Sequence, residues 1–62
     1  MEASDGKIWF ATDGGGLFVY DGVKFRQFNK QKGFFSDVVY SLAQDKLGRI
    51  WIGTGGEGLI CY

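Results

Sequence analysis

Residues 48–62 read GRIWIGTGGEGLICY, and residues 6–20, which read GKIWFATDGGGLFVY, repeat this stretch. The two stretches align without a gap, with position 6 on position 48, and they are identical at eight of fifteen positions. In the second copy the identical residues are Gly48, Ile50, Trp51, Thr54, Gly56, Gly58, Leu59 and Tyr62. Self-similarity at a fixed period indicates a repeat architecture. The chain therefore holds one full repeat unit and roughly the first half of the next.

The repeated unit has the pattern of short strands. The runs Ile8–Thr12 and Ile50–Thr54 are apolar and are followed closely by glycine clusters, which is typical of buried strands. Val38–Gln44 begins with β-branched and aromatic residues, which favour strands. No stretch keeps a helical period, and the glycine spacing would break any helix longer than two turns.

A hairpin is predicted around Asp21-Gly22, which separates Leu17–Tyr20 from Val23–Phe28. An Asp-Gly pair fits a two-residue type I′ turn, in which both central residues need positive φ. Such a turn fixes which residues face each other across the two strands. The predicted pairs are Tyr20–Val23 and Phe18–Phe25 on one face, with Val19–Lys24 and Leu17–Arg26 on the other, more exposed face.

These signals define the fold class that we expect. A period of roughly 40–50 residues with four short antiparallel strands per unit is typical of a β-propeller blade, and the shift from position 6 to position 48 falls in that range. Leucine-rich repeats are shorter, at roughly 20–29 residues, and the common helical arrays need helices that this sequence does not predict. The sequence therefore predicts an all-β fold of antiparallel four-stranded propeller-type blades, with about one and a half blades in the chain.

The composition excludes most catalytic and metal-binding classes. Without histidine there is no Ser-His-Asp or Cys-His nucleophile and no plausible zinc cage. The single cysteine, Cys61, cannot close an internal disulfide. Seven basic and seven acidic residues give zero net charge, which argues against nucleic-acid binding. We expect no enzyme activity, no cofactor and no metal site.

The length of the chain predicts association. A domain of 62 residues buries too small a share of its surface to be more than marginally stable alone. The expected partners are other blades of a longer parent or copies of the chain itself, in a homo-oligomer. The apolar runs are shorter than the roughly 18 residues of a membrane span, and the acidic, polar start lacks a signal-peptide pattern.

The residues resemble a known family. Gly48-Arg49-Ile50-Trp51-Ile52-Gly53-Thr54, followed by Gly58-Leu59, is similar to the G-x-I-W-I/F-G-T…G-G-L signature of two-component regulator propeller repeats. The first copy departs from the motif at several positions: Ala11 stands where the motif has glycine, Asp13 and Gly15 loosen the glycine corner, and Ala3 replaces the acid that corresponds to Asp45. The positions that carry the resemblance are Trp9, Thr12, Gly16, Asp21, Gly22, Asp45, Gly48, Trp51, Gly53, Thr54 and Gly58.

The resemblance implies a role and a location. Such repeats build propellers in the periplasmic sensor regions of bacterial hybrid histidine kinases. These sensor regions bind ligands such as oligosaccharides and do not catalyse a reaction themselves. The resemblance implies that residues 1–62 are one fragment of a propeller, and that the longer parent protein binds a carbohydrate. Its parts would be 7–28 as the second to fourth strands of one blade, 29–37 as the inter-blade connection, and 38–62 as the first to third strands of the next. An alternative is a self-assembling structural propeller module, natural or engineered, without a ligand of its own.

Four residues are candidates for ligand contact. In propellers the connection between blades and the turn between the second and third strands share the face where ligands usually bind. This places Asp13, Phe35, Asp37 and Glu57 on the expected binding face. Phe34, next to Phe35, replaces a family leucine and is expected in the core.

Other motifs have plainer interpretations. Gly53–Gly58 matches G-x-G-x-x-G, but a dinucleotide site needs a helix after it, so a tight turn between strands is favoured. Trp9 and Trp51 could stack on sugar rings, but their matching mid-strand positions favour packing between blades. Cys61 is expected as a small apolar filler rather than as an exposed thiol that forms an intermolecular disulfide.

Overall fold

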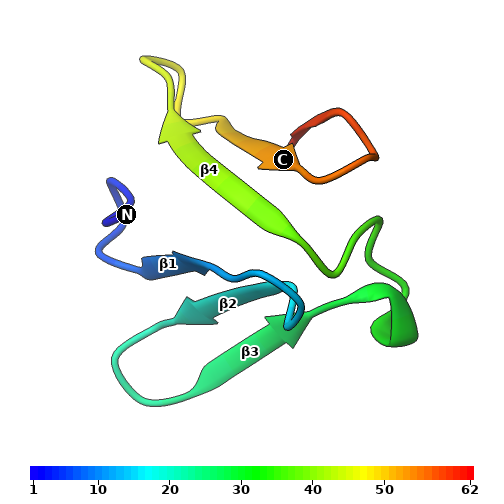
Figure 1. Ribbon diagram of the computed structural model, residues 1–62. Coiled ribbons are helices and arrows are strands. Elements are labelled where there is room, and N and C mark those ends of the chain that lie inside the picture. The colour runs from blue at the N-terminus through cyan, green and yellow to red at the C-terminus, as the bar shows by residue number, and fades with distance from the viewer.

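The computed structural model describes residues 1–62, which form two antiparallel sheets of three strands each (Figure 1). Each sheet is an up-and-down run in which neighbouring strands are consecutive in the chain. This arrangement confirms the all-β fold with antiparallel, blade-type sheets. The strands are β1 (Ile8–Ala11), β2 (Leu17–Tyr20) and β3 (Phe25–Phe28) in one sheet, and β4 (Val39–Gln44), β5 (Ile50–Thr54) and β6 (Leu59–Cys61) in the other.

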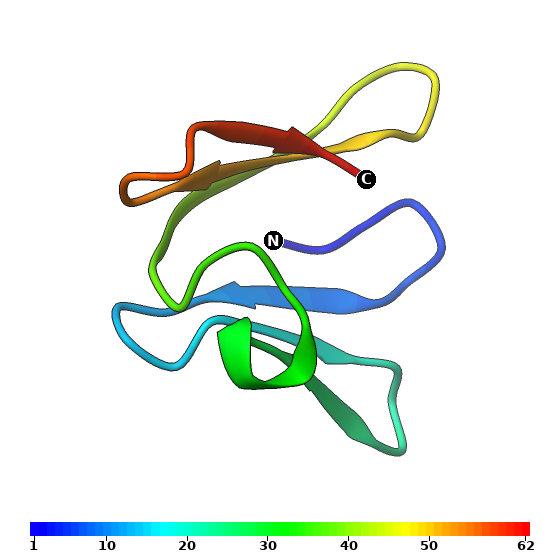
Figure 2. The same ribbon diagram turned by 90° about the vertical axis from the view of Figure 1, so that its right-hand side faces the viewer.

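A connection with one short helix joins the two sheets. Between β3 and β4 the chain forms the 3-10 helix η1 (Lys30–Lys32), capped by the side chain of Asn29 and ended by Gly33. Gly33 has a φ of 89°, which favours glycine at the end of a helix. Figure 2 shows the sheets as two layers, with the N-terminal segment lying between them.

The sequence repeat is reproduced in the strand register. Trp9 pairs with Val19, and at the equivalent place in the second copy Trp51 pairs with Cys61. The same correspondence extends to the N-terminus, because the bridge between Glu2 and Ile8 matches the pair Gln44 and Ile50. The N-terminal residues thus lie beside β1 as the end of β4 lies beside β5.

The two sheets pack against each other through faces that are not equivalent in the repeat: the face that is buried in one copy is exposed in the other. In the first sheet Trp9, Leu17 and Val19 face the interior and are at most 7% exposed. In the second sheet Ile50 and Ile52 are buried, whereas Leu59, which corresponds to Leu17, is 67% exposed. Residues paired directly across antiparallel strands share a face, so the first sheet presents its Trp9 face to the Ile52 face of the second.

The predicted hairpin register is wrong. Tyr20 pairs with Phe25, not with Val23, and Phe18 pairs with Gln27, so the β2–β3 loop consists of residues 21–24. Asp21 has no positive φ, which excludes a type I′ turn. Its side-chain Oδ1 instead accepts hydrogen bonds from the backbone N–H groups of residues 23 and 24, at 2.9 and 2.8 Å. This side-chain capping stabilises the longer loop.

The predicted exposure of this hairpin is also wrong. Leu17 and Val19, expected on the more exposed face, are among the most buried residues of the chain. Every residue of β2 is apolar or aromatic, so the hydrophobic pattern does not distinguish the two faces. The second sheet packs against the Leu17 face and thereby decides which side becomes the core.

Candidate binding cleft

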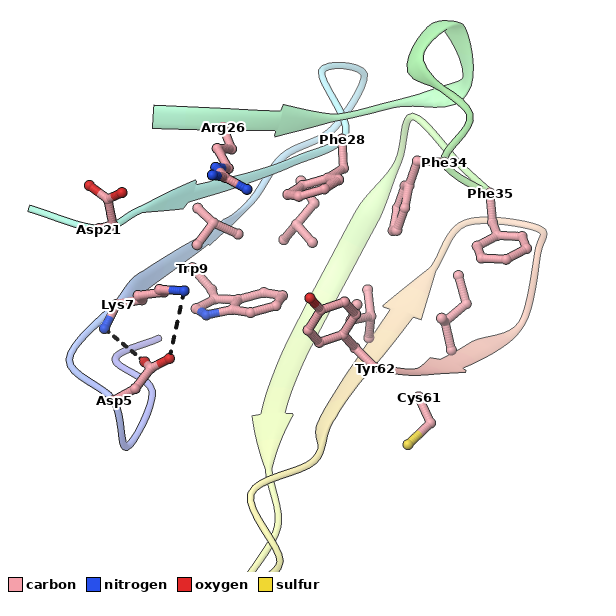
Figure 3. A pocket seen from close by; sticks show the side chains of 14 residues that line it. Asp5, Lys7, Trp9, Asp21, Arg26, Phe28, Phe34, Phe35, Cys61 and Tyr62 are labelled. Carbon is pink, nitrogen blue, oxygen red and sulfur yellow. Dashed lines mark hydrogen bonds and ion pairs between the residues drawn. The ribbon is translucent and has the colours of Figure 1, made fainter. Parts of the chain in front are cut away.

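A cleft of about 390 Å³ lies between the two sheets (Figure 3). Its lining is mainly hydrophobic, and it comes from the buried face of the first sheet, from the connection before β4, and from β5, β6 and Tyr62. Figure 3 shows charged side chains at one end, phenylalanine side chains at the other, and Trp9 and Tyr62 between them. A cleft of this size with an apolar lining and a few polar groups is typical of small-molecule sites.

The aromatic end is built by the connection and by β3. The ring of Phe34 lies 6.2 Å from that of Phe28 and 5.9 Å from that of Phe35, between centroids. Phe34 is half-buried and packs against the core, as the sequence predicted. Phe35 is 63% exposed and lines the cleft, so its ring is free to contact a ligand.

The charged end combines two acids and two bases. Lys7 Nζ lies 4.0 Å from Asp5 Oδ2, and both side chains are at least half exposed. Backbone hydrogen bonds from Lys24 and then Val23 lower the pKa of Asp21 below its ordinary value, so this carboxylate is ionised and engaged with its own loop. Arg26 forms no ion pair. Lys7 is paired with Asp5, so of the two bases only Arg26 is free of an ion pair.

Trp9 carries a buried donor without a partner. The residue is 7% exposed, and its indole Nε1 is buried and makes no hydrogen bond. In the second copy of the repeat, Trp51 Nε1 donates to Asp45 Oδ2 at 3.0 Å. The residue at the Asp45 position of the first copy is Ala3, which has no side-chain acceptor. The missing acid thus explains the orphaned donor.

The structure separates the four predicted ligand-contact residues. Phe35 lines the cleft, but Asp13, Asp37 and Glu57 do not. Asp37 is held by the loops, because its Oδ1 accepts a hydrogen bond from the backbone of Lys30 at 2.8 Å. Glu57 forms a 3.6 Å ion pair with the Lys30 side chain, and Asp13 makes an isolated bridge with Val38. Ligand contact by these residues stays a prediction.

Sequence reasoning missed the charged end of the cleft. No motif singles out Lys7 or Arg26, and the pattern around Asp5 and Asp21 indicates only turns. The available signal was the mismatch of Ala3 with the acid of the other copy, which leaves a tryptophan without its acceptor. Only the fold places that tryptophan beside the exposed charges of Lys7 and Asp5 (Figure 3).

The remaining motifs have clear positions. The stretch Gly53–Gly58 spans the end of β5 and the turn into β6, across which Thr54 Oγ1 donates to the carbonyl of Gly58 at 2.6 Å. Strand β6 follows directly, as the tight-turn interpretation predicts. Cys61 is exposed, and the prediction that it fills the core is wrong, because it pairs with Trp51 on the face of the second sheet opposite to the buried Ile52. Trp9 packs in the core as predicted, whereas Trp51 is only half-buried.

The arrangement suits binding. No group of three or more histidine, cysteine, aspartate or glutamate side chains is placed to hold a metal ion. No helix is long and apolar enough to cross a membrane. What the cleft offers is an apolar wall for packing and a charged end for orientation.

Fold and repeat together define a class of protein. Antiparallel three-stranded sheets that repeat along the chain and stack face to face are pieces of β-propeller-type blades. Residues 33–56 match the family model described as Two component regulator propeller. Residues 33–56 are thus recognised as a two-component regulator propeller repeat, which confirms the resemblance predicted from the sequence over this stretch. Neither the curated proteins nor the solved structures gave a match.

Proposed function

We propose that this chain is a non-enzymatic blade segment of the periplasmic, ligand-sensing region of a two-component sensor histidine kinase. The observation that carries this proposal is the propeller repeat matched over residues 33–56. In this proposal the segment contributes blades, and the cleft between its sheets contributes to ligand recognition. Blade order follows the sequence prediction: 7–28 supplies the second to fourth strands of one blade and 38–62 the first to third strands of the next.

An oligosaccharide is the proposed ligand of the parent protein. The cleft supports this proposal because its aromatic wall includes the exposed ring of Phe35, and a flat aromatic face can pack on a pyranose ring. Charged groups at the other end supply hydrogen-bond partners for hydroxyl groups.

A titration with a panel of neutral oligosaccharides tests the proposal, with backbone amide NMR shifts of the full chain as the readout. We expect saturable shifts at residues lining the cleft, and a loss of affinity of at least tenfold in Phe35→Ala. Phe10→Ala is the matched control, because Phe10 is 43% exposed but lies on the opposite face of the first sheet. Equal losses of affinity in the two variants, or no shifts at all, would contradict oligosaccharide recognition by this cleft.

A specific observation favours the alternative, a self-assembling structural module. Each sheet leaves one apolar face uncovered: Phe10 and Phe25 on the first sheet are 43% and 62% exposed, and Leu59 on the second is 67% exposed. When the two repeat copies are aligned, the uncovered face of each sheet corresponds to the buried face of the other. A second copy could therefore stack on the first as the two sheets stack within one chain.

Size-exclusion chromatography with light scattering distinguishes the two functions. Repeated head-to-tail stacking is heterologous and must either close into a ring or continue as a filament. A single discrete oligomer would favour the structural module. A monomer, or a mixture that changes with concentration, would favour a sensor segment that needs the other blades of a longer parent.

A further inference from the structure

The two copies of the repeat contain the same turn with different side chains. In the second copy the Asp45 N–H donates to the carbonyl of Arg49 at 2.9 Å, and the Gly48 N–H donates to the carbonyl of Asp45 at 3.1 Å. In the first copy the equivalent bonds run from Ala3 to the carbonyl of Lys7 at 2.8 Å, and from Gly6 to the carbonyl of Ala3 at 2.9 Å. The backbone at residue 3 is therefore arranged as it is at residue 45.

A carboxylate organises the second turn. Asp45 Oδ2 accepts hydrogen bonds from Arg49 Nε at 2.7 Å and from Trp51 Nε1 at 3.0 Å. Asp45 Oδ1 accepts from the backbone N–H groups of Leu47 and Arg49. The second copy thus shows which group satisfies a tryptophan donor and a basic side chain in this arrangement.

The first turn keeps the donors but lacks the carboxylate. Lys7 stands at the position of Arg49, and Trp9 at that of Trp51, whereas Ala3 replaces the acid. Asp5 makes one of the hydrogen bonds that the missing acid would make, since its Oδ1 accepts from the Lys7 N–H at 3.0 Å, as Asp45 Oδ1 accepts from the Arg49 N–H. It does not reach the indole, and Trp9 Nε1 remains buried without a partner. A buried unpaired donor is rare in folded proteins and calls for an acceptor.

The unpaired indole borders the cleft. Trp9 and Lys7 both line the cleft, and Figure 3 shows the nitrogen-bearing edge of the Trp9 ring on the side of Lys7 and Asp5. Arg26 also lines this end and forms no ion pair. The Asp5–Lys7 pair is long and exposed, so an incoming anion would lose little by displacing it. Asp21, the other acid here, is engaged with the backbone of its own loop.

We propose that the cleft binds an organic carboxylate, whose carboxylate group accepts from Trp9 Nε1 and pairs with Lys7 and whose apolar body lies on the aromatic wall. Arg26 adds positive charge at the same end of the cleft. The inference rests on the proposed function in that it assigns a chemical class of ligand to the same cleft. A hydrogen bond between an ionised acceptor and a buried donor is stronger than one between neutral groups, which favours an acid over its amide.

NMR of the Trp9 indole N–H tests this assignment directly. The full chain has two tryptophans, so Trp51→Phe assigns the two indole resonances. We expect phenylacetate to shift the Trp9 resonance downfield in a saturable manner. Phenylacetamide and phenethylamine, which keep the aromatic body but lack the negative charge, should bind at least tenfold more weakly. Equal binding of acid and amide would overturn the proposal.

Ala3→Asp provides the sharpest variant, because it restores the acid of the second copy. The Trp9 resonance should move downfield without ligand, toward that of Trp51, and phenylacetate should no longer shift it. Unchanged phenylacetate binding in a folded Ala3→Asp chain would overturn the proposal. If this variant does not fold, Lys7→Gln takes its place, with an expected affinity loss of at least fivefold. Lys24→Gln, an exposed lysine outside the cleft lining, is its control and should bind as the parent chain does.

Two further results separate this inference from the broader function. If Asp5 accepts from the indole in solution, Asp5→Asn will move the Trp9 resonance upfield in the free chain, and the carboxylate site is overturned. If neutral oligosaccharides bind in the cleft while phenylacetate does not shift the Trp9 indole, the sensing function stands and the carboxylate class is wrong.

Discussion

Trp9 and Tyr62 meet edge to face across the two sheets, with ring centroids 5.6 Å apart and an interplanar angle of 61°. Trp9 belongs to the first strand, and Tyr62 follows the last strand and is held beside β5 by two backbone hydrogen bonds with Ile50. The contact therefore joins one repeat copy to the next across the core. Edge-to-face aromatic pairs add to the stability gained by burying the rings.

The stability of the chain should depend far more on Trp9 than on Trp51. Trp9→Ala removes a ring that is 7% exposed and leaves a cavity between the sheets, which is expected to cost about 3–5 kcal/mol. Trp51→Ala removes a half-buried ring on the outer face and should cost less than half as much. Urea unfolding followed by far-ultraviolet circular dichroism measures both. Equal losses would contradict the assignment of Trp9 to the inter-sheet core.

The strands were predictable because the repeat sets their positions twice. Each apolar run is ended by glycines and appears at the same place in both copies, so errors in one copy are corrected by the other. The observed strands β1, β2, β5 and β6 lie within the repeated stretches, and β4 starts at Val39, next to its predicted start at Val38. Local pattern was sufficient because strand formation here depends on short apolar runs between turns.

Register and burial were not predictable in the same way. Asp-Gly is compatible with several loop lengths, and the choice of the longer loop depends on side-chain capping by Asp21, which adds only a small energy. The buried face of β2 depends on which sheet packs against it, which is a tertiary property. The charged end of the cleft was hidden for the same reason, since Arg26 and Lys7 come to line one cleft only after folding.

Acid should destabilise the chain through Asp45. The hydrogen bond from Trp51, followed by that from Arg49, lowers the pKa of Asp45 from 3.8 to about 2. Since the pKa is lower in the folded state, the ionised carboxylate stabilises the fold above pH 3.8, and this stabilisation is lost as the pH falls toward 2. Thermal unfolding between pH 6 and pH 2 measures the effect. Asp45→Asn should be less stable at pH 6 and should lose less stability on acidification.

Asp21 should contribute to the same acid sensitivity, with a different structural cause. Its pKa is lowered by backbone hydrogen bonds from Lys24 and Val23, so protonation weakens the β2–β3 loop. Asp21→Asn should also reduce the pH dependence, and combining it with Asp45→Asn should reduce it further. A combined variant with the pH dependence of the parent chain would show that other carboxylates control acid unfolding.

The glycines at positions 16 and 58 occupy equivalent places in the repeat but should tolerate alanine differently. Both have positive φ, 81° and 80°, so alanine is strained at each by about 1–2 kcal/mol. At Gly16 an added Cβ would also overlap the carbonyl oxygen of Phe28, whereas nothing lies near it at Gly58. Gly16→Ala should therefore cost at least about 3 kcal/mol. Urea unfolding that gives equal losses would contradict the close approach of β3 to this turn.

If the chain self-associates as the structural-module alternative proposes, a charge on either uncovered face should block that association. Leu59→Lys places a cation on the outer face of the second sheet, and Phe25→Lys does so on the outer face of the first, where Phe25 stacks on Tyr20 with centroids 4.5 Å apart. Because head-to-tail stacking uses both faces, each variant should reduce the oligomer to monomer in light scattering. Leu47→Lys is the control, since Leu47 is 77% exposed in the β4–β5 turn, outside both faces. If only one face proved sensitive, the contact would be isologous, and copies of the chain would pair face to face rather than stack as blades.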